Sequence, residues 1–159
     1  MTELQAALAA AYKILAKRAL SEKALRERLV KKKIPARTID RAVKELTETR
    51  LLSDQALAEN MAQSRVKDRL LGNFRIEQDM IQRGIPREMV QKAVRQAADE
   101  ADSPTEEERA FQALKKRAAQ IRLKDPEALK RRLFGYLARR GFDPETIQSA
   151  LERYGRQAP

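Results

Sequence analysis

The sequence contains neither cysteine nor histidine among its 159 residues. Without cysteine the chain can form no disulfide bond and perform no thiol chemistry, which is compatible with a cytoplasmic protein. Histidine is the commonest general base and the commonest metal ligand, so its absence removes the usual centre of a catalytic site. We therefore predict no catalytic residue, no bound metal and no cofactor, and we expect a protein that is not an enzyme.

Glycine, aromatic residues and long apolar runs are scarce as well. Five residues are glycine and 4% are aromatic, which argues against an all-β fold with its many tight turns. No run of about 18 apolar residues is present, so we predict no membrane span. The first four residues, Met1 to Leu4, lack the basic stretch of a secretory signal, and we expect a cytoplasmic location.

Helix-forming and charged residues dominate instead. Ala, Leu, Glu, Lys, Arg and Gln are abundant, and all of them favour helices. The net charge of +11 is uneven: residues 1–51 hold 13 Lys and Arg against 6 Asp and Glu, residues 52–104 hold 8 against 9, and residues 105–159 hold 13 against 8. Two basic ends around a neutral centre predict an acidic partner. A charged, solvated helical surface is the simpler alternative.

The stretch from Leu71 to Val94 predicts two short helices joined at a glycine. Asn73 is placed to cap the first helix with its side-chain oxygen. Gly84 suits the left-handed residue that ends this helix. Pro86 suits the first turn of the next helix, where its missing N–H costs nothing.

The same pattern occurs once upstream and once downstream. When Leu29, Met80 and Leu137 are superposed, the apolar positions coincide without a gap inside any copy. The matching sets are Leu25, Ile76 and Leu133; Ile34, Ile85 and Phe142; Ile39, Val90 and Ile147; Ala42, Ala93 and Ala150; and Val43, Val94 and Leu151, with Pro35, Pro86 and Pro144 after the three junctions. We infer an internal repeat, although amphipathic helices can also align by chance.

These patterns predict an all-α fold of nine helices, arranged as three tandem three-helix repeats. We place the repeats at residues 1–51, 52–102 and 103–155, followed by a frayed tail at 156–159. Because each repeat has little apolar surface of its own, stacked repeats would share their cores. The result would be an elongated, curved array, either right- or left-handed.

A few large side chains have two interpretations. Met61, Met80 and Met89 recur at helical spacing, which predicts core positions. Tyr12 and Phe74 could stack on a nucleic-acid base, but packing between helices is the simpler explanation. We expect Tyr12 on the inner face of the first helix.

The candidate binding residues are basic side chains from all three repeats. Any one of them could instead be ordinary solvated helix surface, and those of the middle repeat could pair with nearby Asp and Glu residues. The candidates are Lys31, Lys32, Lys33 and Arg37; Arg65, Lys67, Arg69 and Arg75; and Lys115, Lys116, Arg131, Arg132, Arg139 and Arg140.

Three motifs in order resemble those of the RecX family over about residues 8–154. The central signature is carried by Leu52-Ser53-Asp54, Leu57-Ala58, Arg65, Gly72-Asn73-Phe74-Arg75-Ile76 and Met80-Ile81-Gln82-Arg83-Gly84-Ile85. The first is carried by Ser21-Glu22, Leu25 and Leu29, and the third by Arg139-Arg140-Gly141-Phe142 and Ile147. The family usually has glycine where this chain has Lys33 and Arg50, and both positions could need a left-handed backbone.

RecX proteins are three tandem three-helix repeats that regulate the recombinase RecA. The resemblance implies that this protein is a cytoplasmic monomer that binds RecA–DNA filaments along their groove, with or without touching single- or double-stranded DNA. It would block filament extension or promote disassembly, and so lower the ATPase, strand-exchange and coprotease activities of RecA in DNA repair, recombination and the SOS response. Two alternatives stay open: a sequence-independent basic DNA-binding helical protein, and a helical scaffold for another acidic protein.

Overall fold

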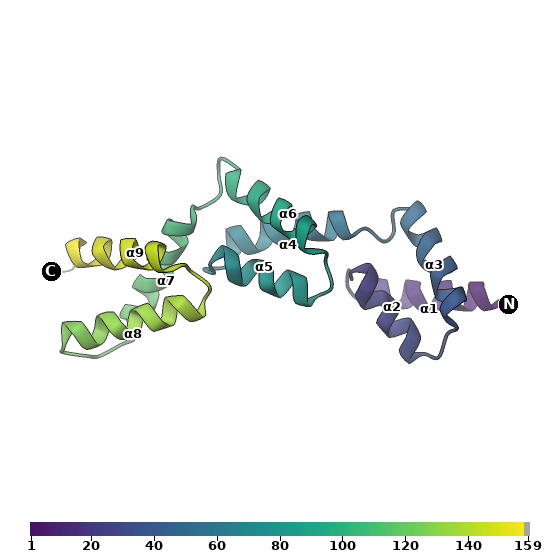
Figure 1. Ribbon diagram of the computed structural model, residues 1–159, viewed down its shortest axis with the longest axis horizontal. Helices are drawn as coiled ribbons and strands as arrows, with labels where there is room; N and C mark the ends of the chain where they lie inside the picture. The colour runs from purple at the N-terminus through teal and green to yellow at the C-terminus, as the bar shows by residue number, and fades with distance from the viewer. Residues whose placement is uncertain (158–159) are drawn as a thin grey trace.

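The computed structural model describes residues 1–157, and these residues form helices and connecting turns without a strand. The predicted all-α fold is therefore confirmed for this part of the chain. Nine helices follow one another as predicted (Figure 1): α1 Glu3–Leu15, α2 Glu22–Lys31, α3 Ala36–Glu48, α4 Asp54–Asp68, α5 Asn73–Gln82, α6 Arg87–Asp99, α7 Glu106–Ala118, α8 Pro126–Arg139 and α9 Pro144–Gln157.

Side-chain caps fix where several helices begin. The hydroxyl oxygens of Ser21, Ser53 and Thr105 each accept a hydrogen bond from the backbone N–H three residues later. Thr2 does the same for Gln5, whose side chain accepts the N–H of Thr2 in return, so α1 starts with a capping box. These bonds satisfy amide groups that a helix start would otherwise leave unpaired.

Left-handed residues end the helices at the junctions. Gly84 and Gly141 have φ angles of 90° and 86°, as the repeat predicts. Lys33 and Arg50 have φ angles of 61° and 59°, so the expected left-handed backbone is present without glycine at both positions. A side chain with a Cβ atom adopts this region at some energetic cost.

The helices form three modules in a row, which makes the molecule elongated (Figure 1). We name α1–α3 module 1, α4–α6 module 2 and α7–α9 module 3. Each module has its own cluster of buried apolar side chains, which includes Leu29, Met80 or Leu137, so the described modules have separate cores and not the shared core that we expected. The helices of each module fall within the predicted repeat limits. The limits themselves, at residues 51/52 and 102/103, remain a prediction.

Several details differ from the prediction. Tyr12 is 45% exposed, because the inner face of α1 is formed by Ala7, Ala11 and Ile14 instead. Met80 is fully buried as predicted, whereas Met89 is 40% exposed.

The other two differences concern helix ends. Asn73 is not a helix cap: Gly72 takes that position, and Asn73 is the first residue of α5. At the C-terminus, α9 continues through Arg156 and Gln157, which we expected to be frayed. The rest of the expected frayed tail, residues 158–159, lies outside the described residues.

Candidate functional site

The modules are joined by a contact that occurs twice. At joint 1–2, between modules 1 and 2, the hydroxyl of Ser21 donates a hydrogen bond of 2.6 Å to the carbonyl of Arg83. At joint 2–3, the backbone N–H of Gly72 donates a bond of 2.9 Å to the carbonyl of Arg140. In both cases the C-terminal end of one module's second helix meets the N-terminal end of the preceding module's second helix. The opposite partial charges of these helix ends attract each other.

A carboxylate reinforces each joint. Asp54 accepts the N–H of Glu22 at 2.8 Å across joint 1–2, and Glu106 accepts the N–H of Asn73 at 2.7 Å across joint 2–3. Asp54 and Glu106 are the first residues of α4 and α7, so the same position performs the same task in both modules. Burial raises the pKa of both carboxyl groups, and the bonds from the two amides oppose that shift.

The cap at joint 1–2 gives a pH-dependent prediction. Since the folded pKa of Asp54 is raised, protonation favours the folded state, and this contribution disappears as the pH rises through the folded pKa. Asp54→Asn keeps the accepting oxygen and removes the charge, so we expect unchanged or higher stability at neutral pH. Asp54→Ala leaves the amide of Glu22 unpaired and should cost about 1 kcal/mol. Urea unfolding of both variants from mildly acidic to neutral pH measures these changes in stability. Equal losses of stability in the two variants would contradict the capping role of Asp54.

Joint 2–3 is filled by a buried arginine. Arg109 in α7 is 1% exposed, and its Nε donates to the carbonyl of Leu71 at 3.0 Å. Its Nη1 donates to the carbonyl of Pro104 at 3.1 Å, and its Nη2 donates to Oδ1 of Asn73. Burial lowers the pKa of Arg109, and the nearby charge of Glu106 partly offsets that shift. One guanidinium group thus ties module 3 to the start of α5.

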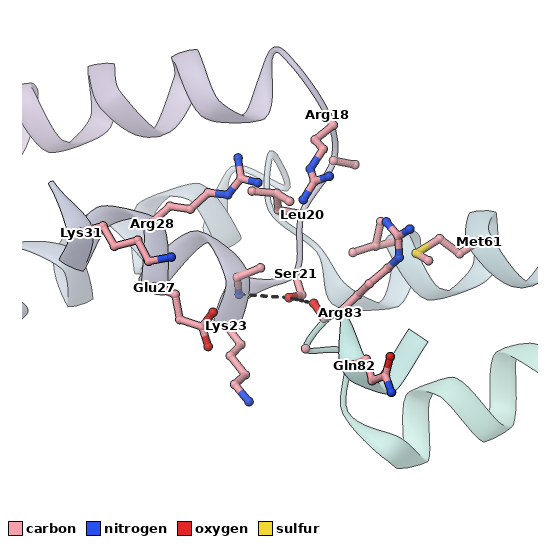
Figure 2. A pocket seen from close by; sticks show the side chains of 14 residues that line it. Arg18, Leu20, Ser21, Lys23, Glu27, Arg28, Lys31, Met61, Gln82 and Arg83 are labelled. Atoms are coloured by element: carbon pink, nitrogen blue, oxygen red, sulfur yellow. Dashed lines mark hydrogen bonds between the residues drawn. The ribbon is translucent and has the colours of Figure 1, made fainter. Parts of the chain in front are cut away.

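Joint 1–2 lacks this arginine and is open. Leu57 is the fourth residue of α4, as Arg109 is the fourth residue of α7, and an apolar side chain cannot bond to the surrounding carbonyl groups. A cleft of about 350 Å³ lies there instead, with Leu57 and Met61 of α4 on one wall and the α1–α2 turn and α2 on the other. Figure 2 shows this cleft and the hydrogen bond from Ser21 that crosses its base.

The cleft is strongly basic. Its lining holds five cationic side chains and a single carboxylate, that of Glu27, which points away from Arg18 and Arg28 in Figure 2. No cation of the lining forms an ion pair with another described residue. A cleft lined by one sign of charge concentrates the electrostatic potential and attracts anions. The cations are Arg18, Lys23, Arg28, Lys31 and Arg83.

Most of the predicted binding residues lie outside this cleft. Of the first-repeat candidates, Lys31 lines the cleft, while Lys32, Lys33 and Arg37 are exposed around the α2–α3 turn. Near joint 2–3, Arg140 donates to the carbonyl of Leu70 at 2.7 Å and lies over the ring of Tyr136. The exposed candidates outside the cleft whose side chains have no described polar contact are Lys32, Lys33, Arg37, Arg69, Lys116, Arg131, Arg132 and Arg139.

Other candidates form contacts with neighbouring residues of the same chain. Asp79 accepts from Arg65 at 2.9 Å and lies 3.4 Å from Nε of Arg75, the pairing that we considered as an alternative for the middle repeat. Lys67 pairs with the carboxylates of Glu100 and Asp102, which raise its pKa. Lys115 lies over the ring of Phe111. Their assignment to a binding surface stays a prediction.

Sequence reasoning missed Arg18, Arg28 and Arg83. These three lie far apart in the sequence, Arg18 in the pair Lys17-Arg18 and the other two without a basic neighbour, but they meet where modules 1 and 2 join. One signal was available: Arg83 aligns with Arg140 in the repeat, directly before the junction glycine. A systematic comparison of junction positions would have selected it.

The fold and its joints define an all-α protein of three tandem modules with cations gathered where the modules meet. Within residues 1–157, no helix combines the length and hydropathy needed to cross a bilayer. Models of the first, second and third three-helix domains of RecX match residues 7–46, 53–94 and 105–151. Each match falls on one of the modules described above.

Similar proteins agree with these matches. The regulatory protein RecX of Trichlorobacter lovleyi is 30% identical over 129 residues, which cover 79% of this chain and 80% of that protein. The RecX of Clostridioides difficile is 29% identical over 115 residues, or 72% of this chain but only 52% of that longer protein. The crystal structure of RecX from Lactobacillus salivarius superposes with a TM-score of 0.84 at 16% identity and covers 97% of both chains, so the fold is shared. The chain belongs to the RecX family of regulatory proteins.

Proposed function

We propose that this protein is an inhibitory regulator of the recombinase RecA. It binds RecA–DNA filaments along their groove and blocks extension or promotes disassembly. The ATPase, strand-exchange and coprotease activities of RecA fall as a consequence, which places the protein in DNA repair, recombination and the SOS response. It acts as a cytoplasmic monomer without a cofactor and catalyses no reaction.

The row of three modules carries this proposal. Corresponding hydrogen bonds hold each module to its neighbour, from the hydroxyl of Ser21 to Arg83 at joint 1–2 and from the N–H of Gly72 to Arg140 at joint 2–3. A filament is a polymer of repeated subunits, and a ligand with several linked modules gains affinity because later contacts form at high effective concentration. Preferential binding to one filament geometry is then enough to shift the filament between states.

Direct binding of DNA without RecA is the second candidate, and the basic cleft at joint 1–2 favours it. Sedimentation separates the two functions. We expect the protein to co-sediment with RecA filaments, and to do so at salt concentrations where its binding to the same DNA without RecA has been lost, since non-specific DNA binding falls steeply with salt. Co-sedimentation that disappears together with DNA binding would support the DNA-binding protein instead.

Charge reversal in module 1 tests the filament-binding surface. We expect Lys31→Glu, Lys32→Glu and Lys33→Glu together to weaken inhibition of RecA roughly tenfold or more, because like charges would then face an acidic partner. The circular dichroism of the helices should be unchanged.

A control with the same change of charge lies on α6, where Arg87, Lys92 and Arg95 are exposed and form no ion pair with a described residue. Reversing these three should have a smaller effect on inhibition. Equal loss in both variants would show that only net charge matters, and no loss in either would remove the Lys31–Lys33 cluster from the interface.

A further inference from the structure

The two joints differ at the fourth residue of α4 and of α7, and this difference affects whether space remains between the modules. At joint 2–3, the guanidinium group of Arg109 is buried and bonded to three groups around it. At joint 1–2, Leu57 stands in that position, and the space is an open cleft of about 350 Å³. Both joints have a carboxylate that accepts a backbone N–H and a donor to the carbonyl at the end of a second helix, which is the hydroxyl of Ser21 at joint 1–2 and the N–H of Gly72 at joint 2–3. Joint 1–2 is therefore the place where a ligand could enter between modules.

Cations reach this cleft from both modules. Figure 2 shows Arg18, Arg28 and Lys31 on the side of module 1 and Arg83 on the side of module 2. Within the described residues, none of them has a carboxylate partner. Like charges gathered around one cleft repel one another, and a bound anion would relieve that repulsion. A planar guanidinium group is suited to bidentate contacts with phosphate oxygens.

Part of the lining of the cleft is apolar. Leu20, Leu57 and Met61 contribute to its lining, and Leu20 is buried while the other two are partly exposed. A carboxylate group would bind to the cations but would leave the apolar residues of the cleft without a contact. A single nucleic-acid strand has both kinds of surface, since its phosphates are anionic and the faces of its unpaired bases are apolar and can contact a methionine sulfur.

We propose that the cleft at joint 1–2 binds single-stranded nucleic acid, with its phosphodiester groups held by Arg18 and Arg28 of module 1 and Arg83 of module 2. Because the three arginines come from two modules, the bound strand bridges the joint that lacks the Arg109 bonds. The site borders the filament-binding surface proposed above, since Lys31 belongs to both, but its three arginines lie outside that surface and it needs no RecA to bind its ligand.

Binding of a fluorescein-labelled oligothymidine, measured by anisotropy against salt, tests this site. We expect Arg18→Gln, Arg28→Gln and Arg83→Gln together to weaken binding roughly 10- to 50-fold at physiological salt. The slope of log K against log salt should become shallower by about 2, because each phosphate contact to a single strand contributes roughly 0.7. The bond from Ser21 to Arg83 uses the backbone carbonyl and survives these substitutions.

The matched control removes the same charge elsewhere. Arg41, Arg87 and Arg95 are exposed, lie outside the cleft and form no ion pair with a described residue. Their joint replacement by glutamine should change affinity and slope little. Equal weakening by both triple variants, or by neither, would overturn the proposal. If the triple variant of the cleft unfolds, the single variant Arg18→Gln is measured in its place. An unchanged salt slope in that variant would also overturn the proposal.

Two further arms identify the ligand. Polyglutamate of comparable charge should compete poorly with the oligothymidine, and duplex DNA of the same length should bind more weakly. Competition by polyglutamate as strong as that by unlabelled oligothymidine would overturn the proposal in favour of an acidic protein ligand. Tighter binding of the duplex, lost in the cleft variant, would overturn the assignment to a single strand.

Discussion

Replacing Gly72 by alanine is expected to destabilise the protein by about 3 kcal/mol. A Cβ atom at this position would lie 2.1 Å from the carbonyl oxygen of Gly141 and 2.5 Å from the backbone nitrogen of Phe142. These are backbone atoms that cannot rotate away, so joint 2–3 must open. The cost combines overpacking, typically 1–3 kcal/mol, with loss of the bond from Gly72 to Arg140, about 1 kcal/mol. Urea unfolding followed by circular dichroism measures the effect.

The same substitution at Gly155 is the control. This glycine lies within α9, and a Cβ atom there would have no neighbour within 4 Å. Alanine favours the helix over glycine, so we expect Gly155→Ala to raise stability by roughly 0.5–1 kcal/mol. The two variants should thus shift the unfolding midpoint in opposite directions. A Gly72→Ala protein as stable as the parent would show that the backbones at joint 2–3 do not need this close approach.

Replacing Arg109 by leucine is expected to have the second large effect, a loss of roughly 3–5 kcal/mol. The substitution leaves the carbonyl groups of Leu71 and Pro104 without their donor and removes the positive charge beside the partly buried carboxylate of Glu106. A buried group left without its hydrogen-bond partner typically costs about 1–3 kcal/mol, and two carbonyl groups lose their donor here. Because the bonds link two modules, unfolding should also become less cooperative, as expected when the interface between repeats weakens.

Arg109→Lys separates charge from geometry. Lysine keeps the positive charge but cannot direct three N–H groups to Leu71, Pro104 and Asn73 as the planar guanidinium does. We expect an intermediate loss of stability. Full retention of stability in the lysine variant would assign the role of Arg109 to charge alone, and full retention in the leucine variant would contradict its role in the joint.

The sequence predicts the helices and modules well because their signals are local. Apolar spacing around Leu29, Met80 and Leu137 and the glycines at the junctions each act within a few residues, and the structure confirms them. The left-handed conformation of Lys33 was also predictable, since the repeat places it in register with Gly84 and Gly141.

The joints could not be predicted, because they depend on residues that are distant in the sequence. Arg109 looks like an ordinary charged residue of an exposed helix, and only its meeting with Leu71 and Asn73 makes it a buried joint residue. For the same reason the sequence pattern wrongly predicts Asn73 as a helix cap. In the structure Asn73 is the first residue of α5, and the carboxylate of Glu106 in the next module accepts its N–H. Contacts of this kind can be predicted only when the relative positions of two modules are known.

The same limit applies to the candidate site. The run from Lys31 to Lys33 stands out in the sequence, and the structure places only its first residue in the cleft between modules 1 and 2. Arg18, which follows Lys17, and Arg83 lie far apart in the sequence, and the structure brings them to the same cleft. A high local density of lysine or arginine is therefore an incomplete guide to where an elongated repeat protein concentrates its charge.

The proposed regulation of RecA is tested most directly by the steady-state rate at which RecA hydrolyses ATP on single-stranded DNA as this protein is titrated. If the protein occupies the filament and displaces or blocks RecA subunits, the rate must fall with increasing concentration, and it must fall less for the variant reversed at Lys31, Lys32 and Lys33. An unchanged rate at concentrations where the protein is bound to the filament or to DNA would contradict the proposed regulation.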